Sequence, residues 1–295
     1  MSIGLLRSPF TVIDGGLSTA LEELGERPAG LLWTAATLLD HPEVITAAHR
    51  LYVDAGADVV LTSSYQASAA GFVRAGLTWS AARQLLASTT AVARASGAAV
   101  VACSVGPFGA CLGDGSEYRG DYAASWDEVR AFHRERLEVL VDSSPDVYAI
   151  ETIPTLAEAE IVLEELRALT DAPAWVSFSC ADEAHTCGGD VFAEAAARVA
   201  PGVSAVGLNC TAPRLVEPLL DSLLAAGITL PYVVYPNHGA QWDGDHQCWI
   251  GTAGGLELPS LVPAWLGRGA ALIGGCCGVG SAGIRALAEL RSSLA

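Results

Sequence analysis

The sequence contains no lysine, and all 16 of its basic side chains are arginine. Enzymes that form a Schiff base with a substrate or with pyridoxal phosphate need a lysine amine, so this chemistry is excluded. The phosphate-binding P-loop ends in Gly-Lys-Ser/Thr and is excluded for the same reason.

Positive charge and long apolar runs are also scarce. The 16 basic residues face 33 acidic ones, which gives a formal net charge of -17. Such a surface repels phosphate, so we expect no nucleic-acid partner. No stretch reaches the roughly 18 apolar residues of a membrane span. Residues Met1–Phe10 lack the pattern of a signal peptide. We therefore expect a cytoplasmic protein without a membrane partner, as a monomer or a small homo-oligomer.

The 295 residues are 51% hydrophobic, which supplies a large core and excludes disorder. Short apolar, β-branched runs alternate with longer helical patterns. The predicted strands are Thr11–Gly16, Asp58–Ser64, Ala98–Ser104, Val147–Thr152, Ala174–Cys180, Ala205–Cys210, Tyr232–Asn237 and Ala271–Cys276. The predicted helices are Pro42–Ala55, Ser80–Ser96, Trp126–Val141, Leu156–Leu169, Val191–Val199, Ala212–Ala226, Leu258–Leu266 and Ile284–Leu294.

Eight such units in this length predict an α/β fold, a single-domain (β/α)8 TIM barrel over residues 1–295. A doubly wound sheet is the alternative, although it usually has fewer strands and a nucleotide-binding fingerprint. The segment Gly278–Gly283 matches G-x-G-x-x-G, but no second strand follows it in the sequence. We interpret it as a turn into the last helix.

Polar residues and thiols follow the predicted strands, where barrel active sites are built. Long connections follow the third and seventh strands, at Val105–Ser125 and Pro236–Leu258. Cys210 ends the sixth strand, and Cys276-Cys277 end the eighth after two glycines. Three thiolates with one open position are a typical catalytic zinc site. The adjacent pair alone would more simply be buried thiols, but the third cysteine at the same mouth favours zinc.

The remaining cysteines lack such a context. We expect thiols in the core or in loops for Cys103, Cys111, Cys180, Cys187 and Cys248. Cys180 and Cys187 flank a loop with His185, so a regulatory metal or a disulfide stays open there. His238 and His246 could support the zinc ligands, but exposed loop histidines are the simpler expectation.

Several motifs together resemble the homocysteine S-methyltransferase family. They are Asp14–Gly16, Thr62–Ala67, Gly113–Gly120, Ile150–Thr152, Gly207–Cys210, Tyr235–Asn237 and Gly274–Gly278. The Asn-Cys and Gly-Gly-Cys-Cys motifs are the most specific, and the similarity runs over nearly the whole chain. Asp114–Gly120 resembles the branch that takes its methyl group from S-methylmethionine.

The resemblance implies a zinc-containing barrel with Cys210, Cys276 and Cys277 as ligands. It places homocysteine near Asp14 and Glu151, and an ammonium group suits a pair of carboxylates. The substrate residues expected from it are Asp14, Gly15, Ser64, Tyr65, Glu151, Thr152, Asn209 and Asn237. No catalytic residue is expected beyond the zinc site.

The implied reaction transfers a methyl group from a sulfonium donor to homocysteine and forms methionine. S-methylmethionine is the expected donor, and S-adenosylmethionine could be a second one. Zinc would deprotonate the acceptor thiol, so methyl transfer would need no general base. Two alternatives stay open. One is methylation of another thiol or selenol such as selenocysteine, and the other is a non-catalytic barrel that binds zinc and a thiol amino acid.

Overall fold

The computed structural model describes residues 6–26, 34–239, 241–243, 248–250 and 258–295. An eight-stranded parallel sheet has the order β1-β10-β7-β6-β5-β4-β3-β2. A parallel bridge between Ile13 and Val59 joins its two edges and closes it into a barrel. The strands are β1 (Thr11–Val12), β2 (Val59–Leu61), β3 (Val100–Val105), β4 (Val147–Ile153), β5 (Ala174–Phe178), β6 (Ala205–Asn209), β7 (Tyr232–Tyr235) and β10 (Ala270–Ile273). The predicted (β/α)8 barrel is confirmed.

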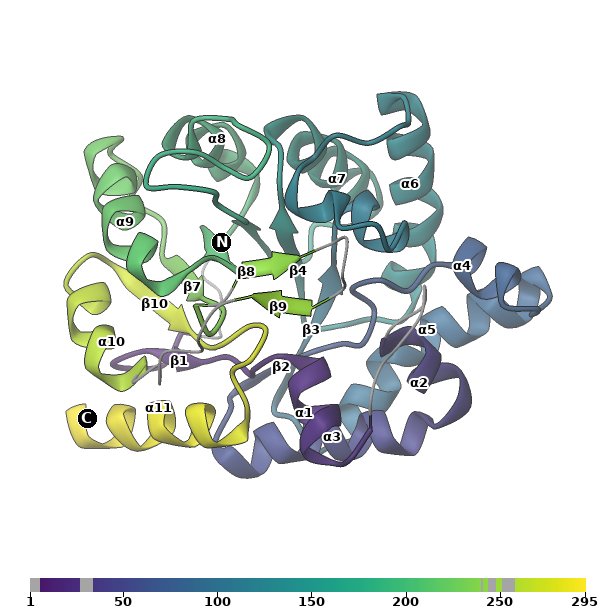
Figure 1. Ribbon diagram of the computed structural model, residues 1–295, viewed down its shortest axis with the longest axis horizontal. Helices are drawn as coiled ribbons and strands as arrows, with labels where there is room; N and C mark the ends of the chain where they lie inside the picture. The colour runs from purple at the N-terminus through teal and green to yellow at the C-terminus, as the bar shows by residue number, and fades with distance from the viewer. Residues whose placement is uncertain (1–5, 27–33, 240, 244–247, 251–257) are drawn as a thin grey trace.

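Helices surround the strands, as Figure 1 shows. They are α1 (Leu17–Glu23), α2 (Thr34–Asp40), α3 (Pro42–Ala55), α4 (Ala69–Arg74), α5 (Trp79–Ala95), α6 (Trp126–Asp142), α7 (Leu156–Leu169), α8 (Phe192–Val199), α9 (Val216–Ala225), α10 (Leu258–Leu266) and α11 (Ser281–Leu294). Four 3₁₀ turns accompany them: η1 (Phe108–Cys111), η2 (Ser116–Tyr118), η3 (Ala200–Gly202) and η4 (Pro213–Leu215). None of the described helices is long and apolar enough to span a bilayer.

The strand pleat divides the apolar side chains into two cores. Alternate residues point to opposite faces of a strand, so β4 sends Val147 and Ala149 inward and Tyr148 outward. Seven barrel strands and Ile13, directly after β1, contribute to the inner cluster, in which Trp175 is the largest side chain. The outer, larger cluster joins the strands to the helices. The inward phase of β4 continues to Glu151, which brings its carboxylate to the mouth of the barrel.

Local signals explain the helix ends that were predicted correctly. Pro42 opens α3, where its missing N–H costs nothing, and Gly56 closes it in the left-handed conformation at φ 100°. Ser125 and Glu128 form a reciprocal capping box at the start of α6. The predicted limits of α3, α7 and α10 agree with the structure at both ends.

Short elements in the connections were missed by the sequence reading. These are α1, α2, α4 and the antiparallel pair β8 (Gln241–Asp243) and β9 (Cys248–Ile250). The helices have six or seven residues, too few for a clear periodic pattern. Residues 278–280 turn into α11 as expected, so this segment is the start of the last helix.

Candidate metal centre and substrate pocket

A pocket opens at the carboxyl ends of the barrel strands. Residues at or just after the ends of seven barrel strands line it, together with part of the long connection after β3. Among the substrate residues expected from the sequence, those that line it are Asp14, Gly15, Tyr65, Glu151 and Thr152. All three expected zinc ligands line the same pocket. The barrel therefore brings together eight predicted positions from distant parts of the chain.

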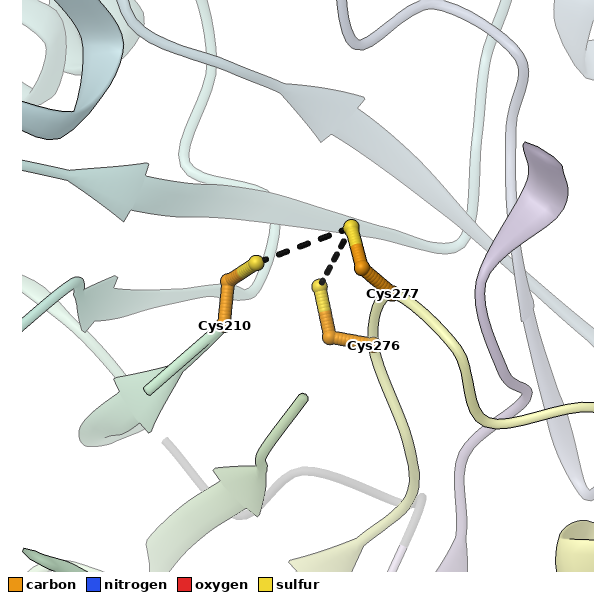
Figure 2. A group of neighbouring side chains, drawn as sticks. All are labelled: Cys210, Cys276 and Cys277. Atoms are coloured by element: carbon orange, nitrogen blue, oxygen red, sulfur yellow. Dashed lines mark hydrogen bonds between the residues drawn. The ribbon is translucent and has the colours of Figure 1, made fainter. Parts of the chain in front are cut away.

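Three thiols of this pocket lie close together and point toward one another (Figure 2). The Sγ atoms of Cys210 and Cys277 are 3.7 Å apart, and those of Cys276 and Cys277 are 4.0 Å apart. A tetrahedral ion with zinc–sulfur bonds of about 2.3 Å requires sulfur separations of about 3.8 Å. The thiols thus have the spacing of three tetrahedral zinc ligands. Within the described residues no other group of three ligand side chains is this close.

Unusual backbone conformations aim the residues at two strand ends. Cys210 has φ 45° and Thr152 has φ 59°, both in the left-handed region. Residues other than glycine adopt this region at a cost, and such positions concentrate at functional sites. At Cys210 this conformation ends β6 and accompanies the approach of its sulfur to Cys277.

Glycines let the eighth barrel strand and the first come close together. Gly278 has φ 77°, which permits the turn directly after Cys277. A Cβ on Gly15 would lie 2.2 Å from the backbone oxygen of Val279. Any side chain at position 15 would push the Cys276-Cys277 turn away from the mouth.

Hydrogen bonds among the three thiols favour Cys277 as the first of them to lose its proton. The thiols of Cys210 and Cys276 both donate to its sulfur. These contacts lower the pKa of Cys277, whereas the neighbouring thiols and burial raise the pKa of Cys276. A divalent cation would remove this difference by taking three thiolates at once.

Two buried carboxylates face the pocket beside the thiols. Asp14 is 4% exposed and its Oδ2 accepts from the backbone N–H of Leu61 at 2.8 Å. Glu151 is 6% exposed and accepts a short hydrogen bond from Ser104. Burial raises the pKa of Glu151 to about 7. Burial, and then the charge of Glu151, raise the pKa of Asp14 well above its usual value. A cation between them would relieve both costs.

The long connection after β3 supplies two further lining residues, Glu117 and Tyr118. The Tyr118 hydroxyl lies 3.5 Å from the sulfur of Cys210. Both residues belong to the Gly113–Gly120 motif, from which no role was predicted for either. The signal was available, since the connection follows a strand end and is unusually long for a barrel loop.

Three expected substrate residues lie behind the pocket wall. Asn209 points into the barrel and bonds the backbone N–H of Thr152 at 2.7 Å. The Asn237 amide donates to the backbone oxygen of Cys210 at 3.2 Å. Ser64 donates to the backbone oxygen of Ser104. These contacts support the strand ends, and a direct contact of the three residues with substrate stays a prediction.

Four of the other cysteines are free thiols, as the simpler expectation for them has it. Cys103, Cys111 and Cys180 are buried free thiols, and Cys187 is a half-buried one. His185 pairs with Asp182 on an exposed loop. The ring Nδ1 of His238 lies 3.2 Å from the backbone oxygen of Cys277, so His238 adjoins the thiol turn. His246 lies outside the described residues, as does the side chain of Cys248.

The fold and the site define a class: a (β/α)8 barrel with a three-thiol metal centre at its mouth. Comparison with known proteins gives the family. Residues 11–291 match the family model described as homocysteine S-methyltransferase, and the chain belongs to this family.

Named relatives cover almost the whole chain. A homocysteine S-methyltransferase of Escherichia coli is 40% identical, with 95% of each chain aligned. The homocysteine S-methyltransferase YbgG of Bacillus subtilis is 36% identical over 97% of this chain and 96% of its own. The metallated crystal form of the Escherichia coli homocysteine methyltransferase MmuM superposes with a TM-score of 0.84 at 38% identity, covering 96% of both chains. Both the family and a metallated relative support a metal cofactor in this site.

Proposed function

We propose that the protein transfers a methyl group from a sulfonium donor to homocysteine at a zinc ion held by Cys210, Cys276 and Cys277. The thiol spacing of 3.7 and 4.0 Å carries this proposal, because it matches tetrahedral zinc. Family membership supports homocysteine as the acceptor. A bound zinc ion would supply a Lewis-acid centre at which the acceptor thiol loses its proton.

The residues around the thiols fit an amino acid substrate. The carboxylates of Asp14 and Glu151 would receive the ammonium group, which gains two charged partners in a buried site. Gly15 and Thr152 line the same part of the pocket. This arrangement fixes the acceptor by its amino end and directs its sulfur toward Cys210 and Cys277.

The chemical step moves no proton. A bond forms between the acceptor sulfur and the methyl carbon, and the bond from that carbon to the donor sulfur breaks. The electron pair of the broken bond stays on the donor sulfur, which becomes a neutral thioether. Because positive charge disappears, a pocket shielded from water favours the reaction. No general base is needed in this step.

The test is turnover with defined substrates. Protein loaded with one equivalent of zinc is incubated with homocysteine and S-methylmethionine, and methionine is quantified. We expect catalytic turnover in the native protein and none in Cys277→Ser, which should also lose bound zinc. Cys187→Ser, a change at a half-buried thiol outside the three-thiol group, is the matched control and should retain both. Zinc binding without methionine formation would contradict the proposed methyl transfer and would leave the alternative of a non-catalytic zinc-binding barrel.

We also propose a reducing, cytoplasmic setting for this chemistry. Seven of the eight cysteines are described as free thiols, and they include the three pocket thiols. Thiol ligands of this kind persist in a compartment where cysteines are kept reduced.

A further inference from the structure

We propose that Glu117 is a specificity-determining residue that receives the positively charged sulfur of the methyl donor, with the rings of Tyr65 and Tyr118 beside it. The inference rests on the proposed function and deepens it, because it assigns the donor's side of the pocket. Three observations carry it: the place of Glu117, its buried carboxylate oxygen without a hydrogen bond, and the number of charges in the pocket.

Glu117 lies next to the reaction centre. It belongs to η2 and lines the pocket, and the hydroxyl of the following residue, Tyr118, is 3.5 Å from the sulfur of Cys210. In a direct methyl transfer the donor sulfur lies in line with the acceptor sulfur, only one methyl group away. A cation on the donor sulfur must therefore lie close to these thiols, on the side where η2 faces them.

One carboxylate oxygen of Glu117 has no hydrogen-bond partner. Its Oε2 is buried without a hydrogen bond, and no arginine of the described residues pairs with it. The buried hydroxyl of Tyr65 in the same pocket is also without a hydrogen-bond partner. Burying such groups unpaired is costly, so this corner is built for a group that arrives with the substrate. Aromatic rings beside a carboxylate suit a poorly hydrated cation.

The position of Glu117 is fixed by contacts outside the pocket. Buried Glu158 of α7 accepts from the backbone N–H of Phe108 at 2.6 Å and from the Tyr122 hydroxyl at 2.5 Å. These two residues flank the segment that carries Glu117. At Gly109 the chain passes so close that an added Cβ would lie 2.5 Å from the backbone nitrogen of Glu117. Glu117 is therefore held against the pocket rather than free to turn into solvent.

The number of carboxylates in the pocket leaves Glu117 available for a second positive group besides the ammonium group of homocysteine. Asp14 and Glu151 suffice for the single ammonium group of homocysteine, and no basic side chain is found among the described lining residues. A third carboxylate would only add repulsion to three thiolates unless another positive group entered. Homocysteine has none left to offer, whereas a sulfonium donor brings one directly to the reacting atoms.

The inference makes a specific kinetic prediction. Positive charge on the donor is largest before transfer and shrinks in the transition state, so Glu117 would stabilise bound donor more than the transition state. In Glu117→Gln the KM for S-methylmethionine should rise at least tenfold, while kcat should stay the same or rise. The KM for homocysteine should stay within twofold. Asp121→Asn removes the same charge from an exposed site of the same loop and should change none of these values.

A binding measurement separates this inference from the proposed function. Calorimetry on zinc-loaded protein without homocysteine compares S-methylmethionine with methionine, which keeps the ammonium group but has a neutral sulfur. We expect Glu117→Gln to lose at least tenfold affinity for S-methylmethionine and little for methionine, with zinc content and melting temperature unchanged. This pattern would support the inference even if turnover were absent. Equal losses for both ligands, or no loss for S-methylmethionine, would overturn it even if turnover were present.

Discussion

At the scale of single residues, the clearest expectation concerns Glu151. This carboxylate is buried at the mouth and is proposed to hold the ammonium group of homocysteine. Glu151→Gln keeps the shape but removes the charge, so a charge-assisted hydrogen bond of about 1.5–3 kcal/mol is lost. The KM for homocysteine should rise about 10- to 100-fold. Steady-state kinetics and zinc analysis check this. An unchanged KM, or lost zinc, would contradict the role.

The control for that variant is Glu164→Gln. Glu164 pairs with Arg130 on an exposed helix surface, and its side chain is 63% exposed. Exposed ion pairs contribute little, so its kinetics should equal those of the native protein.

The protonation of Glu151 predicts a pH dependence. Burial raises its pKa to about 7, so the charged form dominates above this pH and the neutral form below it. Only the charged form attracts an ammonium group. Between pH 8 and pH 6 its fraction falls about tenfold, and the KM for homocysteine should rise by a similar factor. The raised pKa of Asp14 acts in the same direction. Equal KM values at both pH values would refute this expectation.

Residue chemistry could be predicted where it follows from spacing and strand position. The thiols were found because Cys276 and Cys277 are adjacent and Cys210 ends a strand. The proposed donor contact of Glu117 was not predicted, because Glu117 sits in a 3₁₀ turn, where no periodic pattern shows which way a side chain points. Asn209 ends a strand like Asp14, yet it fills the interior below the pocket. The face of the strand to which a side chain points, and its depth in the barrel, decide this difference. A strand predicted from sequence is not placed to within one residue, so neither property can be predicted.

At the scale of secondary-structure elements, α6 holds two strand ends in place. The side chain of Arg136 on α6 is fully buried and donates to the backbone oxygens of Ser64, Tyr65 and Gly106. These carbonyls follow β2 and β3 at the pocket wall. One buried guanidinium therefore satisfies three carbonyls that would otherwise lack partners.

Replacing this guanidinium should affect both stability and the donor's side of the pocket. Arg136→Met leaves buried carbonyls without donors, which should lower the free energy of unfolding by about 3 kcal/mol. Because Tyr65 loses its support, kcat/KM for the donor should fall as well. Denaturant unfolding and kinetics check the two effects. Arg134→Met, an exposed change on the same helix, should cost less than about 1 kcal/mol. Equal unfolding curves for both variants would contradict this role.

Elements were predictable in proportion to their length and their end signals. Helix α7 was placed correctly because it has 14 residues, an amphipathic pattern and Thr155 as its N-cap. Helices α1 and α4 have seven and six residues and pack against longer neighbours. Tertiary contacts rather than local sequence stabilise such short helices, so the sequence alone does not reveal them.

At the scale of the whole molecule, the formal net charge of -17 should steer substrates. S-methylmethionine carries one net positive charge, whereas homocysteine is a neutral zwitterion. Salt shortens the Debye length from about 30 Å at 0.01 M to about 10 Å at 0.1 M and weakens long-range attraction. The kcat/KM for the donor should fall several-fold over this range, and that for homocysteine should hardly change. Equal salt effects on the two substrates would exclude steering.

The barrel itself was the most predictable feature. Eight apolar runs that alternate with helical patterns leave few other ways to pair buried parallel strands. What the sequence left open was how the sheet closes, and the structure answers this with the bridge from Ile13 to Val59. The pairing of β1 with β10 places the end of β1 next to the turn after β10, so that Asp14 and the adjacent cysteines share one pocket.

The central claim is that three sulfurs hold one zinc ion and leave a position for the sulfur of homocysteine. X-ray absorption at the zinc edge of the loaded protein measures this directly. We predict three sulfur neighbours at about 2.3 Å in the protein alone and four after homocysteine is added. A first shell made mainly of nitrogen and oxygen, or a sulfur number that homocysteine leaves unchanged, would contradict the account.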